Sequence, residues 1–284
     1  MVALESALIT HGLPHPLNVQ TALAMEAEVW SAGALPATIA VLDGAVRLGL
    51  TEEELQRLAA TTNALKVSSR GLAYAIATGA TAGTTVSGTM WVASRAGIRY
   101  FATGGIGGVH RHVERTGDVS TDVLELSRTP VAVVCAGAKS ILDIPRTLEY
   151  LETAGVPVLG YRTTEFPAFY TPSSGCPTPF SASGPQEAAR VFRVHRRLGL
   201  PGGVLIACPP PASDLDATKL TQVIERSVRE ADECGIKGSE LTPFLLRRVA
   251  DLSGGESLRA NVALLRNNAR IAGEIAVADA APRA

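Results

Sequence analysis

The sequence predicts an α/β fold of three layers, in which helices cover both faces of a large, mixed but mostly parallel sheet. Short apolar runs alternate with helical patterns along most of the 284 residues, as is typical of βαβ units. Near the start, apolar runs at 36–42 and 46–50 flank an Asp-Gly turn, so a hairpin makes the sheet mixed. The even spread of this pattern predicts one domain over residues 1–284.

Each further element has its own signal. Beyond the hairpin, the expected strands are Val2–Glu5, Ile98–Ala102, Val131–Cys135, Val156–Tyr161 and Val204–Cys208. The expected helices are Asn18–Ala32, Glu52–Ala60 after a Thr51/Glu54 capping box, Thr85–Gly97, Ser120–Arg128, Ser140–Ala154 and most of Leu215–Ala280. The Pro-rich segment Phe166–Pro185 lies between regular elements, and we interpret it as an ordered loop or small lid. Trp30 and Trp91 fall in helical patterns and are expected in the core.

Composition excludes several classes of function. The formal net charge is −1, which does not favour binding to a nucleic acid polymer. No run reaches the roughly 20 apolar residues that a membrane helix needs. The N-terminus lacks the charge and cleavage pattern of a signal peptide, and the four cysteines are scattered without metal-ligand spacing. We therefore expect a cytoplasmic protein with reduced thiols.

The lysine content singles out few positions. The chain has 22 arginines but only four lysines. Because a guanidinium keeps its proton, arginine cannot serve as an amine nucleophile, and lysine is expected to persist where that chemistry is needed. The four lysines are Lys66, Lys139, Lys219 and Lys237.

Polar segments follow three expected strands. Glu5 ends the first strand, the segment 103–111 (TGGIGGVHR) follows the strand at 98–102, and Lys139 follows the strand at 131–135. Ligands of parallel sheets bind beyond the carboxyl ends of strands, so these segments are expected to share a site. Glycines let backbone N–H groups reach a phosphate, and apolar surroundings favour a neutral, nucleophilic amine. The alternatives are a phosphate-binding or helix-capping role for Lys139 and an exposed strand-end carboxylate for Glu5.

A carboxylate pair forms a second candidate. Asp118 and Asp122 are four residues apart, which would place them near one face of a helix. Such a pair could hold Mg²⁺ or Mn²⁺ through water. The alternative is that Asp118 caps the helix and Asp122 is solvated.

Long blocks of the chain resemble the pseudouridine-5'-phosphate glycosidase family, which includes the proteins called indigoidine synthase A. The blocks are ALES (3–6), THGLPHPLN (10–18), GALPATIAVLDG (33–44), FATGGIGGVHR (101–111), DVSTDVLEL (118–126), RTPVAVVCAGAKSILDIPRTLEYLETAGVPVLGY (128–161), EFPAFY (165–170) and TPFLLRRVADLSGGESLRANVALLRNNARIAGEIA (242–276). The likeness covers nearly the whole chain, and blocks of this length are highly specific.

The resemblance implies a homotrimer that reversibly joins ribose 5-phosphate and uracil through a C–C bond. It implies that Lys139 is the nucleophile and Glu5 the general acid. The family's asparagine near the base falls on Asn261, or with less support on Asn267 or Asn268. The other family contacts fall on Lys66, the backbone near Val86, Thr103, His110, Ser120, Thr121 and Asp122 for substrate, and on Asp118 for Mn²⁺.

The chemistry requires these residue types. A C-glycoside has no leaving oxygen, so two carboxylates acting on a glycosidic oxygen do not suffice. The leaving carbon must be protonated, which a carboxylic acid at Glu5 can do. The sugar carbon must be captured, and the amine of Lys139 can form an imine with the opened sugar. A phosphate anchor then supplies binding energy that positions the reacting centre.

Three departures from the family pattern bear on the aglycone. Ser87-Gly88-Thr89-Met90 stands where the family commonly has Ala-Ala/Ser-Thr-Met, Cys208 where it has Asn, and 179–183 (PFSAS) lacks the usual acid. These changes predict a roomier and less polar aglycone site, and hence a C-glycosynthase acting on a larger aromatic as the rival function. Neutral drift is the alternative.

Two other classes of protein are less compatible with the sequence. A catalytically silent sugar-phosphate sensor would not need both Glu5 and Lys139. An unrelated Schiff-base aldolase would explain Lys139 but not the glycine-rich 103–111 segment.

Overall fold

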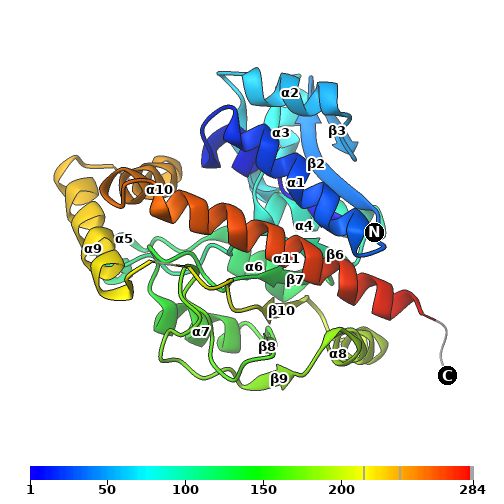
Figure 1. Ribbon diagram of the computed structural model, residues 1–284. Helices are drawn as coiled ribbons and strands as arrows, with labels where there is room; N and C mark the ends of the chain where they lie inside the picture. The colour runs from blue at the N-terminus through cyan, green and yellow to red at the C-terminus, as the bar shows by residue number, and fades with distance from the viewer. Residues whose placement is uncertain (214, 237, 282–284) are drawn as a thin grey trace.

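The computed structural model describes residues 1–213, 215–236 and 238–281, so Lys237 lies outside the described residues (Figure 1). Within these ranges one sheet contains ten strands. They are β1 (Val2–Leu4), β2 (Pro36–Leu42), β3 (Ala45–Leu48), β4 (Leu65–Val67), β5 (Ala82–Thr84), β6 (Tyr100–Ala102), β7 (Ala132–Cys135), β8 (Val158–Tyr161), β9 (Phe180–Ala182) and β10 (Val204–Ala207).

The order of the strands places the candidate residues side by side. The sheet runs β4-β5-β2-β1-β6-β7-β10-β8-β9, with β3 paired to β2. Only the β2–β3 and β2–β5 pairs are antiparallel among the described strands. Strands β1, β6 and β7 are parallel neighbours at the centre. The segments that follow their carboxyl ends therefore meet at one edge of the sheet, as predicted.

Helices form the outer two layers. They are α1 (Leu17–Ser31), α2 (Glu52–Ala60), α3 (Leu72–Ala77), α4 (Val86–Arg95), α5 (Val113–Thr116), α6 (Thr121–Arg128), α7 (Ile144–Thr153), α8 (Pro185–Arg197), α9 (Ala217–Glu233), α10 (Leu241–Leu252), α11 (Glu256–Ala280), the π-helix η1 (Leu8–Gly12) and the 3-10 turns η2 (Ser69–Gly71) and η3 (Gly238–Glu240). The long helix α11 crosses β1, β6 and β7 with α1 and α8 beside it, whereas α4 packs on β1, β2, β5 and β6 with α6 as its neighbour (Figure 1). The three-layer prediction is confirmed.

Small residues allow the close packing of α1 and α11. A Cβ at Gly273 would lie 2.6 Å from the Cβ of Ala32, so only glycine permits this approach. Leu264 and Leu265 of α11 are buried, and both lie next to Gly104, which follows β6. Each such leucine stabilises the fold by roughly 1.5–3 kcal/mol relative to an exposed one.

Several boundaries differ from the prediction. The helix expected from Ser140 begins only at Ile144, because the Asp143 side chain caps it by accepting the Arg146 N–H at 3.1 Å. The short strands β4, β5 and β9 were not predicted, because their sequences LKV, AGT and FSA include polar residues or glycine, unlike the apolar runs of β1 and β6. Lys139 consequently lies in an ordered loop before α7.

The two tryptophans are not core residues. Trp30 is 58% exposed and Trp91 is 40% exposed, so the prediction of core packing is wrong. Helical position alone does not say which side of a helix meets the sheet.

No helix in the described ranges is both long and apolar enough to cross a bilayer.

Candidate active site

A cavity lies beyond the carboxyl ends of the central strands. Five of the predicted site residues line it: Glu5, Lys66, Thr103, Lys139 and Asn261. The other lining residues are Ala7, Leu8, His11, Gly12, Leu13, Gly104, Gly105, Phe169, Thr242, Pro243, Leu246 and Leu265. Side chains from the two ends of the chain and from its middle therefore meet in one place.

Glu5 is a buried carboxyl at the floor of this cavity. It directly follows β1, and its residue is only 8% exposed. The hydroxyl of Thr103, directly after β6, donates a hydrogen bond to Oε1 of Glu5. Burial raises the pKa of Glu5, while Lys139 and the Thr103 hydrogen bond oppose that rise. The acid form of Glu5 is thereby favoured, which suits a proton donor.

Two lysines face the same carboxyl. Lys66 is in β4 and Lys139 follows β7, and both exert electrostatic effects on Glu5. Burial and the nearby charge of Lys139 lower the pKa of Lys66. The backbone N–H of Lys139 donates to the carbonyl of Ile106 at 3.1 Å, which ties its loop to the glycine-rich segment. The cavity thus holds two amines and one carboxyl.

The glycine-rich segment 103–111 forms one wall of the site. Asn268 of α11 braces its start by donating to the carbonyl of Thr103 at 2.9 Å. Gly105 must be glycine, because a Cβ there would lie 2.6 Å from the ring of Phe169. Gly107 likewise approaches Ser120, where a Cβ would lie 2.3 Å from the hydroxyl oxygen. The glycines serve close packing as well as access to the backbone.

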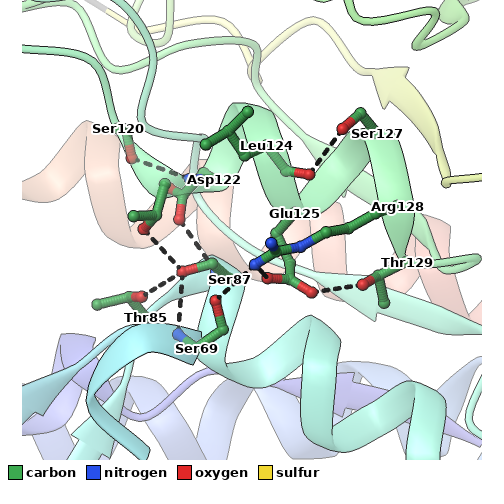
Figure 2. A network of polar contacts seen from close by, with 11 residues as sticks. Ser69, Thr85, Ser87, Ser120, Asp122, Leu124, Glu125, Ser127, Arg128 and Thr129 are labelled. Carbon is green, nitrogen blue, oxygen red and sulfur yellow. Dashed lines mark hydrogen bonds and ion pairs between the residues drawn. The ribbon is translucent and has the colours of Figure 1, made fainter.

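Asp122 joins three segments next to the cavity. Its Oδ1 accepts the backbone N–H of Ser87 at 3.0 Å and its Oδ2 accepts that of Gly107 at 2.8 Å. Figure 2 shows Asp122 beside Ser87, with Ser120 bonding back to the Asp122 backbone. The Ser87 hydroxyl also lies 3.1 Å from that of Thr121. The sequence analysis did not foresee these bonds from Asp122 to two backbone groups.

Val86, Ser120 and Thr121 surround the same point without lining the cavity. Val86 begins α4 and is buried, and Ser120 caps α6 by accepting the Asp122 N–H at 3.2 Å. The backbone N–H groups at the start of α4 and the hydroxyls of α6 therefore gather beside the glycine-rich segment. Helix starts and hydroxyls are groups that bind phosphate.

Asp118 and His110 form the remaining polar pair. Asp118 lies in the loop before α6 rather than capping it, so the expected pairing with Asp122 on one helix face is wrong. Its Oδ2 is 4.0 Å from Nε2 of His110, whose pKa is lowered chiefly by burial. In the described part of the chain no three His, Cys, Asp or Glu side chains converge on one point. A metal here fits only with water and substrate as its other ligands, as Mn²⁺ and Mg²⁺ accept.

The structure distinguishes the three candidate asparagines. Asn261 of α11 lines the cavity. Asn268 is fully buried and holds the glycine-rich segment, and Asn267 points its amide toward the carbonyl of Pro209 at 3.5 Å. Only Asn261 is placed to meet a ligand.

The departures from the family pattern do not face the cavity. A Cβ at Gly88 would lie 2.8 Å from the carbonyl oxygen of Val67, so this glycine lets α4 approach β4. Cys208 is fully buried, and its backbone N–H donates to the carbonyl of Cys135 at 2.8 Å. Neither these residues nor 179–183 line the cavity. These positions therefore do not enlarge the cavity directly, because Gly88 and Cys208 are buried against other segments and 179–183 is mostly exposed to solvent.

Sequence reasoning missed the outer wall. This wall is formed by Leu8 and His11 of η1, by Leu13 directly after it, and by Pro243 and Leu246 of α10. Helix α10 is held to α9 by Arg248, whose Nη2 lies 3.1 Å from Oε1 of Glu230. Leucines in apolar patterns carry no signal that separates a cavity wall from a core.

Comparison with known proteins agrees with this geometry. Residues 1–278 match the family described as indigoidine synthase A-like protein. The chain belongs to that family. It is 54% identical to a pseudouridine-5'-phosphate glycosidase of Methylobacterium nodulans over 98% of this chain and 83% of that protein. It is 53% identical to one of Caldanaerobacter subterraneus over 98% of this chain and 91% of that protein.

Two solved structures share the fold of this family member. The prealnumycin C-glycosynthase AlnA in complex with ribulose 5-phosphate superposes with a TM-score of 0.90 at 41% identity, covering 98% of this chain and 91% of that one. An indigoidine synthase A-like protein from Thermotoga maritima superposes with a TM-score of 0.90 at 34% identity, covering 97% and 91%. The family resemblance seen in the sequence blocks is confirmed.

Proposed function

We propose that the protein is a C-glycosidase that reversibly cleaves pseudouridine 5'-phosphate to uracil and ribose 5-phosphate. The convergence of Glu5, Lys66 and Lys139 on one cavity carries this proposal. The identity of more than half of the chain to pseudouridine-5'-phosphate glycosidases supports the substrate.

Lys139 acts as the nucleophile in the proposed reaction. Its amine bonds to C1' as the bond from C1' to the ring oxygen breaks, and a proton passes from the nitrogen to that oxygen as the sugar opens. The nitrogen lone pair then forms C=N as the C–C bond breaks, and the bonding electrons pass to the aglycone carbon. Glu5 gives its proton to that carbon, and water hydrolyses the imine to release ribose 5-phosphate and restore the amine.

The remaining predicted residues bind the sugar phosphate. Lys66 supplies positive charge at the cavity floor, and Thr103 orients the Glu5 carboxyl through its hydrogen bond. The phosphate binds beside the start of α4 at Val86, with His110, Ser120, Thr121 and Asp122 around it. Fixed groups of this kind position the reacting carbon relative to the amine.

We further propose a cytoplasmic homotrimer that uses Mn²⁺. Asp118 would hold the ion, chiefly through waters, and the ion would add positive charge near the phosphate. The protein is first stripped of metal with EDTA and then incubated with Mn²⁺. Elemental analysis is expected to find one bound ion per chain. Asp118→Ala should lose that ion, and binding unaffected by this change would refute the role.

Borohydride trapping tests the reaction. Incubation with ribose 5-phosphate and borohydride should leave a reduced adduct on Lys139, located by peptide mass mapping. Lys139→Arg should leave none, because a guanidinium keeps its proton. Lys66 lines the same cavity, so an adduct on Lys66 would reverse the two assignments, and turnover of pseudouridine 5'-phosphate without any adduct would refute the imine.

A larger aromatic aglycone is the second candidate. The likeness to AlnA, a prealnumycin C-glycosynthase, and the apolar outer wall of the cavity favour it. Steady-state kinetics separate the two functions. Efficient cleavage of pseudouridine 5'-phosphate, with no coupling of ribose 5-phosphate to polycyclic phenols or quinones, excludes the larger aglycone.

A further inference from the structure

The cavity has two unlike halves. Its floor carries Glu5, Lys66, Thr103 and Lys139, the groups that suit a sugar phosphate. Its outer half is lined chiefly by apolar side chains. They are Leu8, Leu13, Pro243 and Leu246, whereas Phe169 and Leu265 pack against Gly105 and Gly104 beside the floor. A flat ring is bound between apolar surfaces and recognised by a few polar groups at its edge, so the outer half is the aglycone side.

His11 is one of the polar groups on this outer half. It lies in η1, a π-helix whose turn closes when the backbone N–H of Leu13 donates to the carbonyl of Leu8 at 3.0 Å. Single π-turns are frequently found at functional sites. This turn places Leu8, His11 and Leu13 together on the cavity wall, directly after Glu5.

The histidine ring is held from one side. Its Nδ1 lies 2.7 Å from Oγ1 of Thr10, and that hydroxyl lies 3.5 Å from the carbonyl of Ser6. The Thr10 hydroxyl packs directly against Gly83 of β5, where a Cβ on residue 83 would lie 2.3 Å from Oγ1 of Thr10. Within the described residues, Nε2 of His11 makes no hydrogen bond to the protein. The ring is therefore oriented by Thr10 through Nδ1, and Nε2 is left to bond a ligand.

The charge of the ring is also set by its surroundings. Partial burial, and after it the positive charge of Lys66 on β4, lower the pKa of His11. A neutral imidazole offers one hydrogen-bonding nitrogen that can meet a base edge, without attracting the phosphate.

We propose that His11 is a specificity-determining residue that hydrogen-bonds the edge of the planar aglycone through Nε2, alongside Asn261 of α11. The inference rests on the proposed function, because it needs an aglycone beside ribose 5-phosphate. It assigns Thr10 as a positioning residue and leaves the sugar-phosphate contacts to the cavity floor.

The synthetic direction tests this role, because sugar and base are then separate substrates. In His11→Phe, which keeps a ring but removes both nitrogens, the KM for uracil should rise about tenfold, as loss of one good hydrogen bond predicts. The KM for ribose 5-phosphate should stay within about twofold. His11→Asn should restore part of the affinity for uracil, and Thr10→Val should show an intermediate loss.

Borohydride trapping with ribose 5-phosphate alone serves as the second measurement. Trapping should be unchanged in His11→Phe, which shows that the fold and the sugar half are intact. His15→Phe is the matched control, because His15 is exposed and lies outside the cavity wall. An unchanged KM for uracil, or equal rises for both substrates, would overturn the role of His11. No coupling of ribose 5-phosphate to uracil by the wild type would instead reject the proposed function.

Discussion

Burial of Glu5 couples the chemistry of this residue to the stability of the fold. Burial raises its pKa above the ordinary value of 4.5, so the folded state favours the protonated carboxyl. A raised pKa contributes stability that is complete below 4.5 and is lost as the pH rises through the folded value. The same shift keeps the proton available for transfer to carbon.

Replacement of this acid should separate activity from stability. Glu5→Gln should lower the rate of cleavage by at least about 100-fold, as expected for loss of a general acid. In urea unfolding between pH 5 and pH 8, the free energy of unfolding of the variant relative to wild type should increase with pH, because glutamine does not ionise. If the free energies of unfolding of the two proteins change in parallel with pH, folding does not raise the pKa of Glu5.

The sequence indicated the chemical type of Asp122 but not the groups to which it bonds. The sequence indicated a polar residue near the phosphate. The structure adds that its two oxygens hold the backbone of Ser87 and Gly107. Such bonds depend on segments 15 to 35 residues away in the chain, which no local pattern reveals.

At the scale of elements, α4 approaches the end of β4 closely. Gly88 permits this contact, since its position leaves no space for a methyl group beside Val67. Lys66 and Val86 are carried by the same two elements, so the spacing between them depends on the glycine.

Gly88→Ala should therefore affect packing and not the choice of aglycone. We expect the free energy of unfolding to fall by about 1–3 kcal/mol, as for overpacking in a core. Gly184→Ala is the control, because a Cβ there would find its nearest neighbour at 3.8 Å. Thermal unfolding and the ratio of KM values for pseudouridine 5'-phosphate and a larger C-riboside check this. A changed ratio with unchanged stability would restore an aglycone role for this position.

At the scale of the molecule, one groove exposes unusual side chains. Trp91 on α4 and Leu124 on α6 are 40% and 59% exposed, and both line a groove with Arg70, Arg95 and Arg128. Arg95 lies over the Trp91 ring at 5.2 Å. Exposed apolar side chains with arginines are typical of protein–protein interfaces. This groove supports the proposal of a homotrimer.

Light scattering after size-exclusion chromatography measures that assembly. The wild type should show three times the mass of the chain. Leu124→Glu should shift the protein toward monomers, because a carboxylate would be buried against an apolar partner. Leu198→Glu is the control, since Leu198 is 69% exposed and lies outside the groove. A monomeric wild type would refute the trimer.

Much of the molecule followed from the sequence by itself. The alternation of strands and helices, the hairpin and the positions of Glu5 and Lys139 after central strands depend on short-range periodicity and on the rule for strand ends. The scarcity of lysine directed attention to Lys66, which does line the cavity.

Only the tertiary structure decided which side chains line the cavity. It selected Asn261 over Asn268, turned Gly88 and Cys208 away from the cavity, and brought His11 to its wall. The physical reason is that a side chain's surroundings depend on segments distant in sequence. A glycine at a close approach, a π-turn of five residues and a helix resting on a sheet have no period that a sequence displays.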